Sequence, residues 1–596
     1  MFCVLYPRII LLKLRRAALF RIKKLSNSLH EFKWRKLYRS LYIWDLSYSQ
    51  SRMRMHIVIG VFAFVFFVIS ARLIMVATSE YTSYRRANEV ASGSRLDIVD
   101  RNNNLLAVNL PGASLYANPR KIIDQLDAAN KLSRLIPELK KKELLRLFKK
   151  NKSFVWIKRD ISPGEHEKIY NLGIAGLGFE REQKRIYPYG NLLSHVVGYV
   201  GRDLNGLAGL EKYFEKFLTG QKEKEDRRKL GSSLKLSIDV RVQNILSAEI
   251  DKGIKKFSAK GASGIIVDPN NGEVIAMVSK PDFNPHHPGD ARPKQLFNTV
   301  TQGVYEMGSG MKALTVAIGL DSGTTSMHDV YDLSYMKVGG KVIKDTHQMK
   351  GWHSVPHIFM KSSNIGVTQI MLEIGREKLS DYFRKIGFLD RLQIELPERA
   401  RPLFQPFSRW SDLSLTTMSY GYGFSESPAH FMQAMIPVMN GGIIYPLTLL
   451  RRDEGEVLTG ERVFKESTSN SMRQLMRLTV ARGTGKKAEV KGYYVGGKTG
   501  TAYIAHAGKY DKTRRISSFF GVMPASSPKY MIYVVYNEPK GIKETFGWAG
   551  GGWTGAPTVG AVLSRMAALY GLSKLDKNSK EVQELNNVEY KIENET

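Results

Sequence analysis

One apolar run near the start of the chain most constrains how it can fold. Residues 57–76 read IVIGVFAFVFFVISARLIMV, and Arg72 is the single charged residue among them. About twenty apolar residues match the length of a helix that crosses the ~30 Å hydrocarbon core of a bilayer. Arg72 lies near one end of the run, where a long side chain can reach the interface. We therefore predict one transmembrane helix and disfavour a buried core helix or a cleaved signal peptide.

The charges around this run predict its orientation. Residues 1–54 contain 13 Lys and Arg against two acids, Glu31 and Asp45. Because positive flanks stay in the cytoplasm, we expect everything after about residue 79 on the outer side of the membrane. The rest of the +33 net charge is spread along the chain. No zinc-ligand spacing or RNA-binding aromatic signature accompanies it, so nucleic acid is not an expected partner. With Cys3 as the one cysteine, no intramolecular disulfide can form.

Changes in composition predict five parts along the chain. They are a basic cytoplasmic tail (1–55), the transmembrane helix (56–78), a mixed, charged pedestal (79–232), a strand-rich domain (233–572) and a polar, frayed C-terminal tail (573–596). In the pedestal, apolar residues at helical spacing predict one helix near 122–150.

The strand-rich domain shows strand patterns at both of its ends. Strands are expected at 234–239, in a hairpin at 263–279, and at 516–524 and 529–539; helices are expected at 242–257 and 556–572. Strands from distant parts of the sequence with helices between them favour an antiparallel sheet packed by helices. The predicted fold class is therefore α+β.

The segment Glu306-Met-Gly-Ser309-Gly-Met-Lys312 carries a possible nucleophile and base. Ser309 precedes the apolar stretch ALTVAIGL, which reads as a buried helix. A Ser and a Lys three residues apart share one helix face, so the amine can reach the hydroxyl. A buried lysine also loses part of its preference for the charged form, as a general base near neutral pH requires.

The S-x-x-K pattern alone is weak, because it starts four times in this chain, at Ser232, Ser309, Ser334 and Ser526. Ser309 is the one that opens an apolar helix. Two unique motifs follow in order: Ser362-Ser-Asn364, and Lys498-Thr-Gly-Thr501 within GGKTGTAYI. The order S-x-x-K, S-x-N, K-T-G is the signature of penicillin-recognising serine transferases, β-lactamases included. GGKTGTAYI also resembles an edge strand on which a substrate peptide can add as a further strand.

On these motifs the chain resembles the class B penicillin-binding proteins, most closely the division-specific FtsI type of Gram-negative bacteria. Further segments match the family's pedestal and transferase motifs: Arg95 with 97–101, Glu182 with 185–188, 206–211, 419–423 and 483–485. Two positions depart from the family pattern. Met307 replaces a proline before the nucleophile, and Asn103 replaces a glycine; Asn is the next-best residue for a left-handed backbone.

The resemblance implies a fold and a set of roles. It implies a single transmembrane helix, an elongated pedestal and a serine β-lactamase-like transpeptidase domain. Ser309 would attack the bond between the terminal D-alanines of a stem peptide, Lys312 would take its proton, Ser362 would relay a proton and Asn364 would hold the substrate amide. Lys498 and Thr499 would bind the terminal carboxylate, Gly500 would lie beside the substrate, and the N–H groups of Ser309 and Thr501 would form the oxyanion hole. No metal or cofactor is implied.

The same resemblance implies partners and leaves alternatives open. Expected partners are peptidoglycan stem peptides, β-lactams, the bacterial inner membrane, an FtsW-type glycosyltransferase and other divisome proteins. The alternatives are an elongation-specific enzyme, a β-lactamase or carboxypeptidase, and a non-catalytic scaffold with a vestigial transferase fold. Taken singly, Ser362 could be an ordinary helix N-cap and Lys498 a solvated surface charge. For Arg95, Glu182 and Arg185 a structural salt-bridge cluster is the favoured interpretation.

Overall fold

The computed structural model describes residues 53, 55–73, 95–220, 233–453, 455–506, 508–590 and 592–593. The predicted basic tail lies outside these residues, except for Met53 and Met55. The chain divides into two compact units, Met1–Arg86 and Ala87–Thr596, and each is described by itself.

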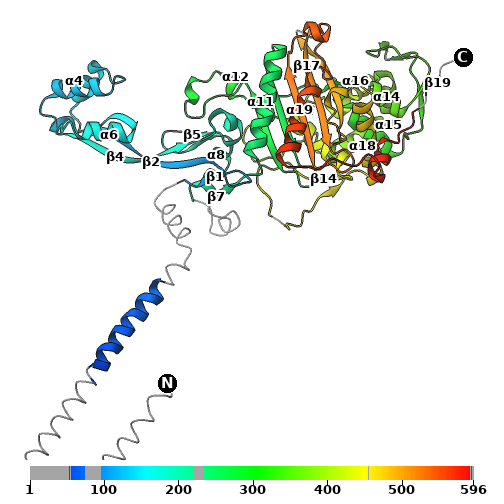
Figure 1. Ribbon diagram of the computed structural model, residues 1–596. Coiled ribbons are helices and arrows are strands. Elements are labelled where there is room, and N and C mark those ends of the chain that lie inside the picture. The colour runs from blue at the N-terminus through cyan, green and yellow to red at the C-terminus, as the bar shows by residue number, and fades with distance from the viewer. Residues whose placement is uncertain are drawn as a thin grey trace, which may run out of the picture. The chain divides into compact units, whose positions relative to one another are not determined.

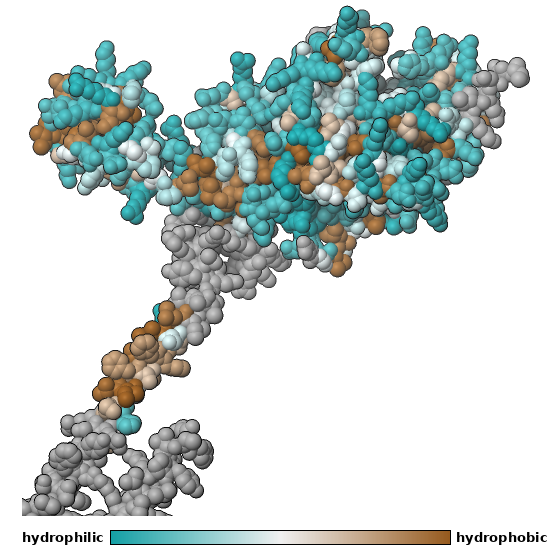
Figure 2. Space-filling model, in the orientation of Figure 1, coloured by the Kyte–Doolittle hydropathy of each residue, from teal (hydrophilic) through white to brown (hydrophobic). Residues whose placement is uncertain are grey.

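The first unit contains the predicted membrane helix. Residues Met55–Leu73 form a helix of 19 residues with a mean hydropathy of 2.2. Its apolar side chains are exposed, and Figure 2 shows hydrophobic residues along its length. A helix of this length and composition can cross a bilayer, and none of its most apolar stretch is buried among the residues that the structure describes.

The pedestal, residues 95–220, is built on a sheet whose longest strands, β2 and β4, pair antiparallel. Strands run in the order β3-β2-β1-β7, with β4 paired to β2. The bounds are β1 (Asp97–Val99), β2 (Leu105–Ala117), β3 (Val155–Ile161), β4 (Leu177–Ile186) and β7 (Ser233–Lys235). Asn103, in the turn between β1 and β2, has φ 63°, which agrees with the left-handed conformation expected of it.

Helices cover one side of the outer part of this sheet. They are α4 (Gln125–Leu135), α5 (Lys141–Phe148) and α6 (Pro163–Tyr170). Leu115, Leu132 and Phe148 belong to their shared core. The single helix expected near 122–150 is therefore wrong. Pro137 lies two residues after the end of α4. The residue before it, Ile136, is extended, because a residue before a proline is disfavoured in helical conformation, so the chain forms two helices.

The inner part of the pedestal contains short elements around a buried ion cluster. The elements are α7 (Ser194–Val197), β5 (Tyr199–Val200), β6 (Gly206–Ala208), α8 (Gly209–Tyr213) and α9 (Glu215–Leu218). The Glu211 carboxylate accepts from Arg95 Nε at 2.5 Å and from Arg185 Nε at 2.7 Å. Glu182, expected in this cluster, instead accepts from Ser114 on the next strand. The cluster exists, but its shared acid is Glu211, and Arg95 also pairs with Glu215 at 2.8 Å.

The C-terminal domain, residues 233–590, is organised by a five-stranded antiparallel sheet (Figure 1). Its order is β16-β17-β18-β8-β9, so strands from both ends of the domain pair in the middle. The bounds are β8 (Gly261–Val267), β9 (Val274–Lys280), β16 (Gly496–His506), β17 (Lys509–Met523) and β18 (Tyr530–Asn537). The predicted hairpin and the predicted edge strand are both present.

Side chains of β18 show how the two faces of this sheet are used. Ile532, Val534 and Tyr536 pack with α11 (Val240–Phe257) and α19 (Gly555–Leu569). The alternate residues Met531, Tyr533 and Val535 pack into the larger core on the other side. The period of two is that of a strand buried on both faces.

The larger core is built by the remaining helices. They are α13 (Lys312–Ser322), α14 (Val355–Lys361), α15 (Asn364–Lys385), α16 (Asp412–Ser419), α17 (Pro428–Met439) and α18 (Glu466–Ala481). Short elements join them: α12 (Pro293–Leu296), β10 (Val330–Asp332), β11 (Met336–Val338), β12 (Lys341–Ile343), β13 (Trp352–Ser354), β14 (Ile443–Ile444) and β15 (Glu461–Arg462).

The C-terminal tail differs from the prediction of a frayed segment. Residues Lys580–Asn586 form α20, which buries Val582 and Leu585 against the domain. Strand β19 (Ile592–Glu593) pairs with β13, and the Tyr590 ring stacks on His357. Two apolar residues three apart on one helix face were enough to dock an otherwise polar segment.

Candidate active site

The proposed nucleophile lies in a tight turn before a buried helix. Ser309 is the middle residue of the 3₁₀ turn Gly308–Gly310, and α13 begins at Lys312. Gly308 has φ +53°, and a Cβ on it would lie 2.3 Å from the carbonyl oxygen of Thr501 on β16. Only glycine permits so close an approach, so this turn is packed directly on the edge strand.

Lys312 is completely buried behind this turn. Its Nζ donates to the carbonyl oxygen of Ser362 at 2.6 Å, to Asn364 Oδ1 at 2.7 Å and to Ser362 Oγ at 3.2 Å. Burial lowers the pKa of Lys312 to about 7, against a smaller opposing effect of the Asp345 charge. Both the neutral and the charged amine are therefore populated near neutral pH.

The expected contact between the Lys312 amine and the Ser309 hydroxyl is not formed. Among the residues that the structure describes, the Ser309 side chain makes no hydrogen bond, and Lys312 is held by the second motif instead. The Ser309 side chain is half-buried.

The second motif occupies a break between two helices. Helix α14 ends at Lys361, its C-cap Ser362 takes a left-handed conformation (φ 62°), and α15 begins at Asn364. The N-cap is Ser363, whose hydroxyl accepts from the Gly366 N–H at 3.0 Å. The alternative interpretation of Ser362 as an N-cap is therefore wrong. Its left-handed backbone directs its hydroxyl to two lysines instead.

Asp345 supports this break and was missed by sequence analysis. It accepts from the Ser363 hydroxyl at 2.7 Å, from the Ile365 N–H at 3.1 Å and from the Asn364 N–H. A carboxylate at a helix N-terminus satisfies N–H groups that have no partner within the helix. Asp345 lies 18 residues before Ser363, and no motif marks it.

Lys498 of the third motif is buried on β16, which excludes a solvated surface charge. Its Nζ donates to Ser362 Oγ at 2.8 Å and lies 5.6 Å from the centre of the Phe359 ring. Burial, and then the nearby charge of Lys312, hold the pKa of Lys498 well below its ordinary value. One hydroxyl, that of Ser362, thus contacts both buried lysines.

The rest of the third motif presents the edge of the sheet. The Thr499 hydroxyl is 2.9 Å from that of Thr484, and Thr501 Oγ1 accepts from the Gly551 N–H at 3.2 Å. A Cβ on Gly500 would lie 2.3 Å from Ser518 Oγ and 2.9 Å from the Met307 carbonyl.

The Thr501 carbonyl faces the nucleophile turn, since it lies next to Gly308. Within an antiparallel strand the N–H and C=O of one residue point to the same side, so the Thr501 N–H points away from β17. Two residues on, the Tyr503 N–H points to that side and donates to the Tyr422 hydroxyl at 3.0 Å.

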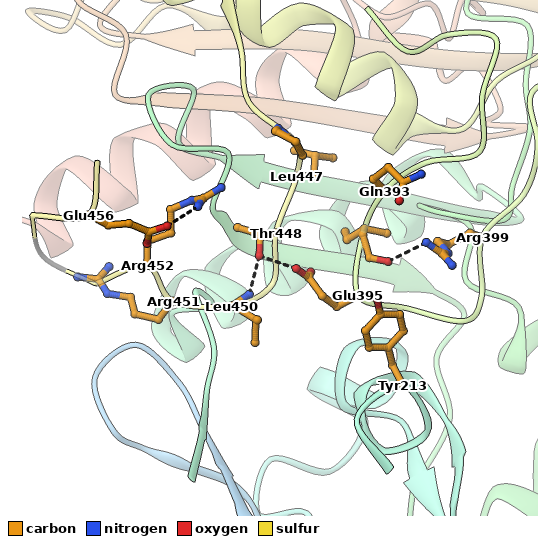
Figure 3. A pocket seen from close by; sticks show the side chains of 12 residues that line it. Tyr213, Gln393, Glu395, Arg399, Leu447, Thr448, Leu450, Arg451, Arg452 and Glu456 are labelled. Atoms are coloured by element: carbon orange, nitrogen blue, oxygen red, sulfur yellow. Dashed lines mark hydrogen bonds and ion pairs between the residues drawn. The ribbon is translucent and has the colours of Figure 1, made fainter. Parts of the chain in front are cut away.

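Among the described residues, no group of three or more His, Cys, Asp or Glu side chains could hold a metal ion. A cavity of about 430 Å³ lies between Tyr213 of the pedestal and loops of the C-terminal domain (Figure 3). Its polar groups largely satisfy one another. Glu395 accepts from the Thr448 hydroxyl at 2.7 Å, and Arg452 pairs with Glu456 at 3.1 Å.

Two family models match the chain. They are the "Penicillin binding protein transpeptidase domain" over residues 262–556 and the "Penicillin-binding Protein dimerisation domain" over residues 91–233. The chain is 35% identical over 541 residues to the probable peptidoglycan D,D-transpeptidase FtsI of Caulobacter vibrioides, covering 88% of this chain and 90% of that protein. It is 29% identical to the FtsI of Escherichia coli K12, covering 79% and 83%.

Solved structures agree on the fold. Penicillin binding protein 3 of Mycobacterium tuberculosis, complexed with ampicillin, has a TM-score of 0.65 at 22% identity and covers 82% of this chain and 98% of its own. The chain therefore belongs to the class B penicillin-binding proteins, which join a dimerisation domain to a transpeptidase domain. The predictions of this family, its fold class and its enzyme class are confirmed.

Proposed function

We propose that Ser309 is the nucleophile of this peptidoglycan D,D-transpeptidase. The observation that carries the proposal is the pair of fully buried lysines, Lys312 and Lys498, which contact the same Ser362 hydroxyl. Two uncompensated lysines in one protein interior weaken folding, and perturbed groups of this kind gather at functional sites. The names of the relatives from Caulobacter vibrioides and Escherichia coli point to the same activity.

Acylation begins with the neutral amine of Lys312. It takes the proton of the Ser309 hydroxyl while the oxygen attacks the carbonyl carbon between the two D-alanines of the donor peptide. The N–H groups of Ser309 and Thr501 stabilise the oxyanion. As the intermediate collapses, a proton passes through Ser362 to the leaving amine, free D-alanine departs, and an ester remains on Ser309. An acceptor amine then attacks the ester, forms the cross-linking amide and returns the proton to the serine.

Lys498 and Thr499 bind the donor's terminal carboxylate in this scheme, with Gly500 leaving space for the peptide backbone. Burial holds the pKa of Lys498 well below its ordinary value, and a bound carboxylate would supply the opposite charge that favours the ammonium form. Asn364, whose Oδ1 accepts from Lys312 and whose Nδ2 donates to the Lys344 carbonyl, would hold the substrate amide in this scheme.

We also propose the cellular setting. The chain would cross the bacterial inner membrane once, with residues 1–55 in the cytoplasm, 56–78 in the membrane, a periplasmic pedestal (79–232), a transpeptidase domain (233–572) and the tail (573–596). The cationic residues before the span support this orientation. An FtsW-type glycosyltransferase and other divisome proteins are the proposed partners. Depletion of a septal enzyme gives filaments, whereas round cells would assign the chain to elongation.

Mass spectrometry of the full-length chain in detergent, treated with penicillin, tests the catalytic proposal. We expect one adduct, on the peptide that contains Ser309, and none in Ser309→Ala with an unchanged melting temperature. An adduct elsewhere, or rapid turnover of penicillin as in a β-lactamase, would reject the proposal. Growth sustained by Ser309→Ala alone would instead favour a scaffold.

A further inference from the structure

Met307, two residues before the nucleophile, stands where the family pattern has proline. Its φ is −81°, so its backbone is close to a conformation that proline would fix, but no ring holds it there. Met307 is buried, and its sulfur accepts a hydrogen bond from the Tyr533 hydroxyl at 3.0 Å. The hydrogen bond from Tyr533 thus restrains Met307 at a position where a proline ring would restrain the backbone covalently.

Tyr533 also links this contact to the sheet. It lies on β18, buried on the face opposite to α11 and α19, and its hydroxyl contacts Ser518 Oγ of β17 at 3.1 Å. Burial raises the pKa of Tyr533, so its hydroxyl keeps its proton and stays a donor. Its ring packs 4.7 Å from that of Phe431, which lies beneath Gly310 of the nucleophile turn.

The Ser309 turn packs against β16 through three residues: Met307, Gly500 and Ser518. Ser518 pairs with Gly500 across β16 and β17, and the Met307 carbonyl lies against the same glycine. The distance between the Ser309 turn and β16 therefore depends on backbone contacts that tolerate no added atom. That same distance separates the two N–H groups of the proposed oxyanion hole.

We propose that Tyr533 is a positioning residue for acylation: its hydroxyl, bonded to the Met307 sulfur and to Ser518, holds the Ser309 turn at its working distance from β16. Tyr533 itself touches no substrate. The inference rests on the proposed function, because acylation of Ser309 is what it affects.

Tyr533→Phe tests the inference with Tyr536→Phe as its matched control. Tyr536 is a buried tyrosine on the same strand, and its hydroxyl contacts Thr558 at 2.9 Å on the opposite face. Tyr533→Phe loses the contacts to Met307 and Ser518, and Tyr536→Phe loses the contact to Thr558. Both should lower the melting temperature, Tyr533→Phe by at least as much as Tyr536→Phe. We expect only Tyr533→Phe to slow acylation by a fluorescent penicillin, by about two- to tenfold, the factor that one hydrogen bond of ordinary net strength represents.

Tyr533→Phe should lower the rate constant of acylation and leave unchanged the dissociation constant of the non-covalent penicillin complex that precedes it. Met307→Leu keeps the shape of the side chain and removes the sulfur. We expect it to slow acylation in the wild-type background and to add nothing in Tyr533→Phe. Wild-type rates in Tyr533→Phe, equal slowing in Tyr536→Phe, or additive effects of Met307→Leu would each overturn the inference. A wild-type chain that takes no label would instead reject the proposed function.

Discussion

Two regions of this protein bury charged side chains in opposite ways. In the pedestal, Arg95 and Arg185 converge on Glu211, and all three are buried. In the transpeptidase domain, Lys312 and Lys498 are equally buried but share a neutral partner, the Ser362 hydroxyl. The pedestal compensates its charges with a carboxylate, whereas the active site compensates its lysines with hydroxyl, amide and carbonyl oxygens.

The difference indicates that the pedestal cluster stabilises the fold, whereas the buried lysines are suited to proton transfer. A buried ion pair with satisfied hydrogen bonds holds segments together, and removing one member leaves an unpaired charge. A buried lysine without a paired carboxylate moves toward its neutral form, which is the form that can accept a proton. The pKa of Lys312, lowered to about 7 by burial, fits a group that must take up and release a proton near neutral pH. Equal burial therefore has different meanings in the two clusters.

The largest expected effect comes from removing the proposed base. Lys312→Met keeps an unbranched side chain without an amine, and we expect the acylation rate by a fluorescent penicillin to fall about 10³-fold, within the range for a general base. Stopped-flow or gel-based labelling measures the rate. Lys361→Met, an exposed lysine one residue before Ser362, serves as control and should react normally. Near-normal labelling of a folded Lys312→Met chain would show that Lys312 is not the base, and its burial would then have no catalytic explanation.

The pedestal cluster should respond in stability. Glu211→Gln leaves two buried arginines without their shared carboxylate, and we expect the free energy of unfolding to fall by about 3–5 kcal/mol. Denaturant unfolding measures it, and the folded fraction should still acylate at the wild-type rate. The control is Glu182→Gln. That half-buried glutamate lies 3.8 Å from Arg159, and its loss should cost about 1 kcal/mol or less. If Glu211→Gln proves as stable as wild type, the cluster does not hold the pedestal.

Sequence alone identified much of this arrangement, for local reasons. Alternating apolar residues indicated the strands, and three motifs in order indicated which lysines are buried together. It did not indicate that Arg95 and Arg185 meet Glu211 and not Glu182, because both acids lie in matching pedestal segments. It also predicted a direct contact from Lys312 to Ser309, whereas the amine is drawn to Ser362 and Asn364 of a different helix break. Partners that meet only through tertiary packing leave no periodic signal.

Asp345 is the clearest case of such a partner, and it gives the smallest expected effect. Acylation should rise with pH through a midpoint near 7, because only the neutral amine of Lys312 accepts the proton. The Asp345 charge favours the ammonium form and so raises the pKa of Lys312. Asp345→Asn should therefore move the midpoint to lower pH and speed acylation at pH 6 relative to the plateau. The gain should stay below about tenfold, which one pKa unit represents.

A pH–rate profile of acylation measures that change. Ser363→Ala serves as the control that distinguishes the effect of the Asp345 charge from a loss of structural support at the helix break. Ser363 donates to Asp345 and caps α15, so its loss weakens the helix break without removing a charge. We expect Ser363→Ala to lower the melting temperature and leave the midpoint in place. An unmoved midpoint in Asp345→Asn would mean that burial alone sets the Lys312 pKa. Asp345 would then serve structure only, as Glu211 does in the pedestal.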